Sequence, residues 1–456
     1  MANIYVRSTD GNNADNGSTW ALAKATLQGA SAISANGDFI YVSQVHAESA
    51  AASVTCNFAG SRTSPLRVIC GNDSAEPPTT AATSATVTTT GGNAITLSSI
   101  LAYIYGISFF CGTGNTAPTM SLNNATITSA NKMVYENCSF QMVATQGNIS
   151  MFAASNSITI WKNCTLKFQS GGGTTPTTLT MPTSGFFHWN GGSVLSGTAT
   201  PTNASGQIFA NSNASPQFLC ENVDFSNFAS DVNITNGGNG TQGVIRNCRL
   251  PASWTGNLVR GATSSTVPMA LYNCASDTAN YKHWVETCAG SIKDELTFTR
   301  AGGASDGATP FSWKMVTTSN CNKFGYPLYC DDIAFWVNAT GVSYTCELHF
   351  LHDSATALNN DDIFVELSYL GSSATPLGTL VSDRVTDILT TVAAHASSGA
   401  SWVTTGMANP NAQKLSVTFT PNMKGYVLLR VGLAVASKTL YLCPKVEVAG
   451  LLNLGQ

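Results

Sequence analysis

Short segments of alternating apolar and polar residues recur along the first 290 residues of the chain, and each ends at an Asn-Cys pair or a close variant. The clearest copies read YENCSF, WKNCTLKF, IRNCRL and LYNCAS, and a fifth, CENVDF, has valine in place of cysteine. Where copies follow one another directly, their asparagines are 25 or 26 residues apart. A repeat of this length, rich in β-branched and small polar residues, predicts a solenoid of short strands. The repeated asparagines are Asn137, Asn163, Asn222, Asn247 and Asn273.

Two weaker copies extend the series. Gly106 in IYGISF takes the asparagine position 31 residues before Asn137. In FFHWNGG we align Asn190 with the repeated asparagines, so that Gly191 replaces the cysteine. An apolar segment begins 13 to 15 residues before each clear asparagine. Every turn of the solenoid is therefore predicted to hold at least two strands.

Alternation around the asparagine predicts which side chains point into the solenoid. Since neighbours along a strand point to opposite faces, the apolar residue two positions before the asparagine and the Cys or Val directly after it form the interior stack. Asparagine suits the corner, because it tolerates left-handed backbone angles and its amide can bond the asparagine one coil away. The predicted interior residues are Tyr135, Trp161, Cys220, Ile245 and Leu271 before the corner, and Phe140, Leu166, Phe225 and Leu250 after it.

The outward positions carry a charge ladder and an apolar column. The residue directly before the asparagine has opposite charges in neighbouring coils, which predicts the ion pairs Glu136–Lys162 and Glu221–Arg246. The alternative is that these charges alternate by coincidence in a chain with few charged residues. An apolar outer column predicts covering by a loop or a partner subunit. The column stands three positions before the asparagine and consists of Val134, Ile160, Leu219, Val244 and Ala270.

Residues 1–42 predict a capping segment. A strand in IYVRSTDG precedes a polar turn, an amphipathic helix from about Ser18 to Ala35 with Ser18 as its N-cap, and a second strand in GDFIYV. The apolar stripe of this helix is Leu22, Leu27, Ala30 and Ile33. The opening resembles the N-terminal cap of right-handed parallel β-helix proteins of the pectate-lyase-like superfamily, in the versions found in structural proteins of tailed bacteriophages. The resemblance covers roughly residues 1–286 and implies the fold, whereas activity varies across the superfamily.

After Cys288 the repeat stops, and eight segments of ordinary strand length follow, among them YTCELHFLHD and GYVLLRVGLAV. Turn signals separate them, which predicts an antiparallel jelly-roll-like β-sandwich. The pattern is similar to β-sandwich modules, often carbohydrate-binding, of phage fibres, although Cys443 replaces an acidic residue common there. We therefore expect an all-β chain: an N-terminal cap with a short helix (1–42), a right-handed parallel β-helix (43–287) and a C-terminal β-sandwich (288–456).

Composition excludes several classes of protein. Hydrophobic residues make up 43% of the chain, enough for a large core, and the net charge of -4 leaves no basic stripe for a phosphate backbone. The first residues lack the features of a signal peptide, and serines interrupt the most apolar stretch, 95–110. We expect assembly in a host cytoplasm and no nucleic-acid or membrane partner.

The 13 cysteines include no CxxC motif and no Cys/His spacing for zinc. In a cytosol the solenoid cysteines are predicted to be free thiols that fill the core as small apolar side chains. Cys321 and Cys330 flank a GYP turn and are the exception, because a hairpin can bring them within disulfide range.

Candidate catalytic residues are few. A glycan-cleaving site needs two carboxylates, or a base beside a cation, and only nine carboxylates lie between Ser43 and Gly290. Glu221 and Asp224, with Asp231 in the next turn, come closest to a cluster, although the charge ladder already accounts for Glu221. The run 186–189, Phe-Phe-His-Trp, is suited to stacking on a sugar ring or to filling an irregular coil of the core.

Metal and cofactor motifs are weaker still. The glycine-rich segment 238–243 is followed by a strand instead of a helix, which excludes a dinucleotide site. His349 and His352 would face opposite sides of a strand, and Asp361 with Asp362 fits a solvated loop better than a calcium site. We assign no catalytic, cofactor-binding or metal-binding residue and expect no cofactor.

These features favour a non-enzymatic structural protein of a phage virion, either a capsid decoration or a surface fibre. The resemblance to phage β-helices, which form threefold bundles, implies a homotrimer packed along the outward apolar column. Its partners would be other virion proteins of the capsid or tail, with a cell-surface glycan as a further candidate. The alternatives are a tailspike-type polysaccharide depolymerase, acting as a lyase or a glycoside hydrolase, and a glycan-binding adhesin or receptor-binding protein.

Overall fold

The structure is a computed structural model of the chain. It describes residues 1–61, 63–112, 118–124, 131–142, 148–154, 157–167, 178–195, 206–211, 216–235, 241–259, 269–287 and 290–293. Beyond these it describes the strands named below and residues 342–343 and 436–437. The chain divides into two compact units, of which the first contains Met1–Asn280.

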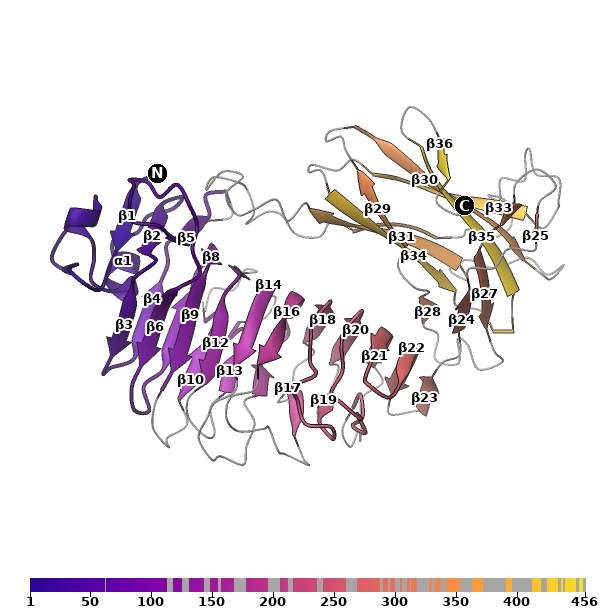
Figure 1. The fold of residues 1–456 in the computed structure, drawn as a ribbon, viewed down its shortest axis with the longest axis horizontal. Coiled ribbons are helices and arrows are strands. Elements are labelled where there is room, and N and C mark those ends of the chain that lie inside the picture. The colour runs from indigo at the N-terminus through magenta and orange to yellow at the C-terminus, as the bar shows by residue number, and fades with distance from the viewer. Residues whose placement is uncertain are drawn as a thin grey trace. The chain divides into compact units, whose positions relative to one another are not determined.

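The first unit is a parallel β-helix, in which each strand pairs with strands one coil earlier and one coil later (Figure 1). Its main sheet runs in the order β1 (Asn3–Val6), β2 (Phe39–Ser43), β5 (Leu66–Gly71), β8 (Leu101–Tyr105), β11 (Lys132–Glu136), β14 (Ile158–Lys167), β16 (Phe186–Leu195), β18 (Gln217–Glu221), β20 (Gln242–Arg246) and β21 (Met269–Ala275). The strands β22 (Asn280–Thr287) and β23 (Gly290–Lys293) follow β21 along the chain, and most of their residues belong to the second unit. A side ladder joined to it contains β3 (Ala47–Ala50), β6 (Ala85–Thr89), β9 (Ile107–Cys111) and β12 (Ser139–Met142). The second sheet consists of β4 (Val54–Asn57), β7 (Ile95–Ser98), β10 (Thr119–Ser121), β13 (Asn148–Ser150), β15 (Thr178–Met181), β17 (Gln207–Asn211) and β19 (Asn233–Thr235).

The repeated asparagines form the corners of the solenoid, as predicted. All five adopt left-handed backbone angles, with φ between 46° and 57°. Asn163 Nδ2 donates to Asn137 Oδ1 at 2.6 Å, and Asn273 Nδ2 donates to Asn247 Oδ1 at 2.9 Å. The amides therefore bond from one coil to the next, which compensates for a backbone conformation that most residues avoid.

The coil that contains FFHWNGG differs from the prediction by one residue. Asn190 pairs with Lys162 and Glu221, while Gly192 pairs with Cys164. Gly191 therefore occupies the corner, with φ 72°. The sequence permits both alignments because glycine and asparagine both accept positive φ. The structural alignment turns every side chain of the first half of β16 to the face opposite from the predicted one.

Aromatic side chains stack through the interior of the solenoid. Phe140 lies 4.4 Å from Trp161 between ring centroids, Trp161 lies 4.9 Å from Trp189, and Trp189 lies 5.5 Å from Phe225. The predicted interior positions before and after the corner are confirmed, since all nine residues are buried. Eight cysteines are buried free thiols, as predicted: Cys56, Cys70, Cys111, Cys138, Cys164, Cys220, Cys248 and Cys274. Cys321 and Cys330 lie outside the described residues.

The cap contains the two predicted strands, but its helix is much shorter than predicted. A 3-10 turn, η1 (Trp20–Leu22), precedes α1 (Leu27–Ser31), and Thr26 caps α1 by accepting from Gly29 N at 3.0 Å. Lys24 N donates to Tyr5 O at 2.8 Å and Arg7 N donates to Lys24 O at 2.9 Å. The middle of the expected helix is thus used to cover the open edge of β1, which protects that edge from pairing with another chain.

The second unit consists of antiparallel strands, as expected for its alternating segments. One sheet is formed by β24 (Leu296–Thr299), β27 (Trp313–Thr317), β35 (Thr439–Glu447), β30 (Tyr344–His352), β33 (Ala412–Phe419) and β36 (Leu451–Asn453). Another contains β28 (Leu328–Tyr329), β29 (Ile333–Val337), β34 (Gly425–Leu433), β31 (Ile363–Gly371) and β32 (Thr391–His395), and β25 (Ala304–Ser305) pairs with β26 (Pro310–Phe311). The packing of these sheets into a jelly-roll-like sandwich, and the three domain boundaries, stay predictions.

Candidate functional site

Three outward columns of side chains cross the strands β14, β16, β18 and β20 of the main sheet. They follow from the pairing register, because residues paired between adjacent parallel strands lie about 4.8 Å apart on the same face. The first column is Ile158, Phe186, Gln217 and Gln242. The second is Ile160, His188, Leu219 and Val244. The third is Lys162, Asn190, Glu221 and Arg246.

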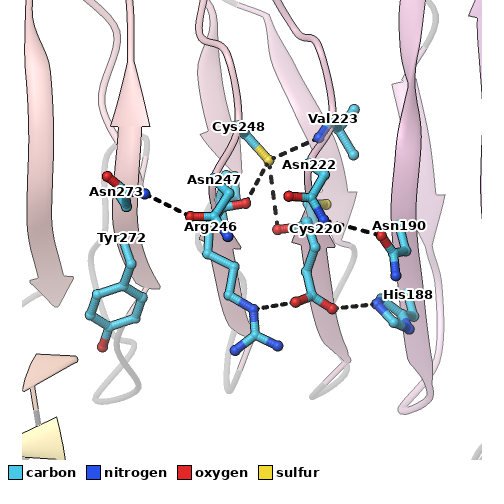
Figure 2. A network of polar contacts seen from close by, with 12 residues as sticks. His188, Asn190, Cys220, Asn222, Val223, Arg246, Asn247, Cys248, Tyr272 and Asn273 are labelled. Carbon is cyan, nitrogen blue, oxygen red and sulfur yellow. Dashed lines mark hydrogen bonds and ion pairs between the residues drawn. The ribbon is translucent and has the colours of Figure 1, made fainter. Parts of the chain in front are cut away.

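His188, Glu221 and Arg246 meet on this face. His188 Nε2 lies 2.8 Å from Glu221 Oε2, and Arg246 Nε donates to Glu221 Oε1. Figure 2 shows His188 and Arg246 pointing to this carboxylate from the two neighbouring strands. The Glu221 side chain is 0% exposed, that of His188 5% and that of Arg246 11%. The predicted Glu221–Arg246 pair is confirmed, and its burial makes it stronger than an exposed pair.

The Glu221 carboxylate is held ionised. Burial alone would raise its pKa, but the hydrogen bond from His188 and the positive charge of Arg246 outweigh burial and lower the pKa from 4.5 to about 2. The carboxylate is therefore negatively charged near neutral pH and accepts hydrogen bonds from His188 Nε2 and Arg246 Nε. The cluster thus places the His188 imidazole, a base, beside the Glu221 carboxylate, which fixes its orientation, and Arg246 helps to keep that carboxylate charged.

The surroundings of the cluster are partly exposed. Leu219 and Val244 are half-buried, and Phe186 is half-buried with its ring centroid 6.2 Å from that of His188. Gln217 and Gln242 are exposed, and Gln217 Nε2 donates to Gln242 Oε1 at 3.0 Å. The face thus combines an aromatic ring, two amides and an acid–base group, which are the side chains that recognise and process polar ligands.

The candidate carboxylates do not act as one cluster. Asp224 interacts with Arg249 at 3.6 Å and accepts from Ser226 N at 2.9 Å, whereas Glu221 binds His188 and Arg246. Asp231 lies in a turn before β19. The aromatic run 186–189 is divided by the alternation of β16, because Phe187 and Trp189 are in the core and Phe186 and His188 face outward.

Sequence reasoning missed the contact of His188 with Glu221. With Asn190 placed at the corner, His188 belongs to the interior stack, whereas with Gly191 there it joins the outward column. The Gly-Gly pair at 191–192 was the signal that could have revealed the shift, since Gly192 has φ 100°, a conformation that other residues rarely adopt.

The rest of the outer face differs in part from the prediction. Glu136 and Lys162 are paired residues of β11 and β14, and Tyr103 Oη donates to Glu136 Oε2 at 3.0 Å. Val134 and Ile160 face outward as predicted, but they are only 1% and 2% exposed in the single chain. Ala270 is also buried, at 6% exposed, so three of the five residues in the apolar column expected to need a partner are already covered.

The described residues contain no group of three or more His, Cys, Asp or Glu side chains placed to hold a metal ion. His349 and His352 lie three residues apart in β30. Asp361 and Asp362 lie outside the described residues. Among the helices of the described part of the chain, none is long and apolar enough to cross a membrane.

No family model matches the chain, and no curated protein matches it. Among solved structures, the chain is similar to the enzymatically active domain of bacteriophage CBA120 tailspike protein 4, with 10% identity, a TM-score of 0.24, and coverage of 93% of this chain and 65% of that one. It is also similar to a Pantoea stewartii glycan biofilm modifying enzyme with a bacteriophage tailspike-like parallel beta-helix fold, with 10% identity, a TM-score of 0.21, and coverage of 91% and 56%. The chain spans less than two thirds of the length of either.

The expectation of a non-enzymatic protein is contradicted by these matches. Both solved structures are named for an enzymatic activity, one as an enzymatically active domain and the other as a glycan biofilm modifying enzyme. The expectation had rested on the scarcity of carboxylate pairs. The other arrangement named in the sequence analysis, a base beside a cation, was not recognised because the alignment placed His188 in the interior, whereas His188 and Arg246 both contact Glu221. The chain is an all-β protein whose first unit is a parallel β-helix.

Proposed function

We propose that the protein is a glycan-modifying enzyme of the phage tailspike kind, a polysaccharide depolymerase whose acid–base group is His188. The observation that carries the proposal is the buried contact of His188 with the ionised Glu221, on a face that also presents an aromatic ring and amides. Such a face is long and regular, because it is built from paired strands, and it suits an extended polymer better than a compact small molecule.

The geometry assigns separate roles to the three charged groups. Glu221 accepts from His188 Nε2, which leaves Nδ1 as the basic atom, and Nδ1 has no hydrogen-bond partner among the described residues. Nδ1 would remove a proton from a water molecule or from the sugar, and Glu221 would stabilise the imidazolium that forms. The positive charge of Arg246 helps to keep the Glu221 carboxylate ionised, so that the carboxylate does not take up that proton.

The test is an assay of the cleavage of purified bacterial capsular polysaccharides, in which the release of reducing ends is measured over time. We expect His188→Gln to lower the rate by at least about 100-fold, the usual contribution of a positioned acid–base group. Asp224→Ala is the matched control, because Asp224 lies beyond the corner at Asn222 and pairs with Arg249, and it should retain the wild-type rate. Cleavage by His188→Gln at the wild-type rate would remove His188 from the mechanism.

We further propose a place on the virion surface or tail and a homotrimeric state. Leu219 and Val244 are the half-buried residues of the outward apolar column and would contribute to the trimer contact, whereas Val134, Ile160 and Ala270 are buried within the single chain. Light scattering of the purified chain measures its mass directly, and a monomer at micromolar concentration would end the trimer proposal without affecting the proposed activity.

A further inference from the structure

We infer that Phe186, Gln217 and Gln242 form a binding subsite for an uncharged pyranose ring, directly beside His188. This inference rests on the proposed function for the reaction, because it names the part of the glycan that is held next to the acid–base group. The binding of the sugar ring, considered apart from any reaction, is inferred from the side chains of the first outward column.

The three side chains are aligned by the solenoid itself. Phe186 pairs with Gln217 and Gln217 pairs with Gln242, so they occupy one face of three consecutive strands. Adjacent strands lie about 4.8 Å apart, so the column spans about 10 Å from the ring to the second amide. That span corresponds to a platform for one sugar ring and the hydroxyl groups on its edge.

Phe186 supplies the apolar part of the platform. Its ring stays half-exposed on the outer face, whereas its neighbours Phe187 and Trp189 are fully buried in the core. An exposed aromatic ring on a rigid strand binds the C–H face of a sugar at little entropic cost. The centroid of the His188 ring lies 6.2 Å from that of Phe186, so a sugar stacked on Phe186 would lie next to the imidazole.

The two amides supply a donor and an acceptor. Gln217 Nε2 donates to Gln242 Oε1 at 3.0 Å, which orients both amides and leaves Gln217 Oε1 and Gln242 Nε2 for a ligand. These two atoms have no partner among the described residues, and both side chains are exposed. One acceptor beside one donor matches two adjacent sugar hydroxyls, since a hydroxyl can both donate and accept.

The charge at this place indicates an uncharged sugar. No residue of the first column on β14, β16, β18 or β20 is charged. On these strands Lys162, Glu221 and Arg246 stand two columns away, and Glu221 pairs with Arg246. The first column continues on β11 to Lys132, two strands or about 10 Å from Phe186. A uronate carboxylate bound between Phe186 and Gln242 would lose hydration and have no cation directly beside it, which is unfavourable.

The experiment is native electrophoresis of the His188→Gln variant in gels that contain neutral or uronate-containing bacterial capsular polysaccharides. We expect retardation by a neutral polysaccharide, and Phe186→Ala in the same background should weaken the apparent affinity by about tenfold. Phe110→Ala is the matched control, because Phe110 is another half-buried outward aromatic residue, on β9 of the side ladder. It should not change retardation.

The outcomes separate this inference from the proposed function. Unchanged affinity of Phe186→Ala, retardation by uronate-containing polysaccharides alone, or no retardation at all would overturn the subsite. If the wild-type chain cleaves a polysaccharide while Phe186→Ala binds it normally, the function stands and the subsite falls. If neutral polysaccharides bind through Phe186 but are never cleaved, the subsite stands as a glycan-binding surface and the enzymatic proposal falls.

Discussion

Replacing Gly191 with asparagine should stabilise the solenoid, because it would complete a row of corner asparagines that is interrupted there. Gly191 lies opposite Asn163 on one side and Asn222 on the other, as the pairing of the flanking residues requires. Its φ of 72° suits asparagine. A Cβ atom at this position would meet Asn163 Cα at 3.7 Å and Asn163 N at 3.8 Å, which are ordinary contacts.

The size of the effect follows from three contributions. A new amide bond to Asn163, like the bond of 2.6 Å between Asn163 and Asn137, is worth about 0.5 kcal/mol at an exposed position. Loss of glycine flexibility in the unfolded chain adds about 0.4–1 kcal/mol. The left-handed backbone costs asparagine part of the roughly 1 kcal/mol that it costs other residues. We expect a net gain of about 0.5 kcal/mol, or a melting temperature about 1–2 °C higher.

Two further variants serve as controls, and their melting temperatures are measured under the same conditions as those of the wild type and Gly191→Asn. Gly191→Ala has the backbone cost without the amide and should melt below Gly191→Asn. Gly192→Asn should be strongly destabilised, because a Cβ atom at Gly192 would lie 2.0 Å from Cys164 O. A tolerated Gly192→Asn together with a destabilised Gly191→Asn would refute the alignment of this coil, and with it the outward position of His188.

Two other predictions concern charge and redox state. Because folding lowers the pKa of Glu221 from 4.5 to about 2, its ionised form stabilises the folded chain by about 3 kcal/mol. This stabilisation is complete above pH 4.5 and is lost as the pH falls toward 2. Melting temperatures of Glu221→Gln should therefore fall less steeply between pH 4.5 and 3 than those of the wild type, and parallel curves would contradict the assigned pKa. Burial raises the pKa of the Cys164 and Cys248 thiols well above 9, so both should resist alkylation in the native chain and react fully after denaturation without reductant. A disulfide at either residue would be detected as a missing alkyl group.

The sequence was sufficient to predict the architecture because the repeat reports on backbone geometry directly. Asn137, Asn163 and the later copies mark left-handed corners, and the alternation around them fixes which residues are interior. The capping helix was overestimated because an amphipathic stripe does not reveal that Lys24 is needed to pair with the edge of β1. Periodicity measures compatibility with a helix, and edge protection is a tertiary requirement that overrides it.

The site was harder to predict, because it depends on a single-residue choice of register and on a contact between different columns. Glu221 was recognised as one half of a ladder pair, yet its second partner, His188, comes from the preceding coil and the neighbouring column. Diagonal contacts of this kind are within reach of long side chains but leave no periodic signal. A shift of one residue in strand β16 was enough to hide the histidine in the predicted core.

The fold does not require a histidine at this place. The second column has Val134 and Ile160 on earlier strands and Val244 on a later one, so apolar side chains occupy the positions equivalent to that of His188. Burying a carboxylate, an imidazole and a guanidinium costs desolvation energy, and well-packed hydrophobic residues often give equal or greater stability. The proposed acid–base role gives a reason for this cost, since burial beside Glu221 fixes the orientation of the His188 imidazole and places an anion next to it.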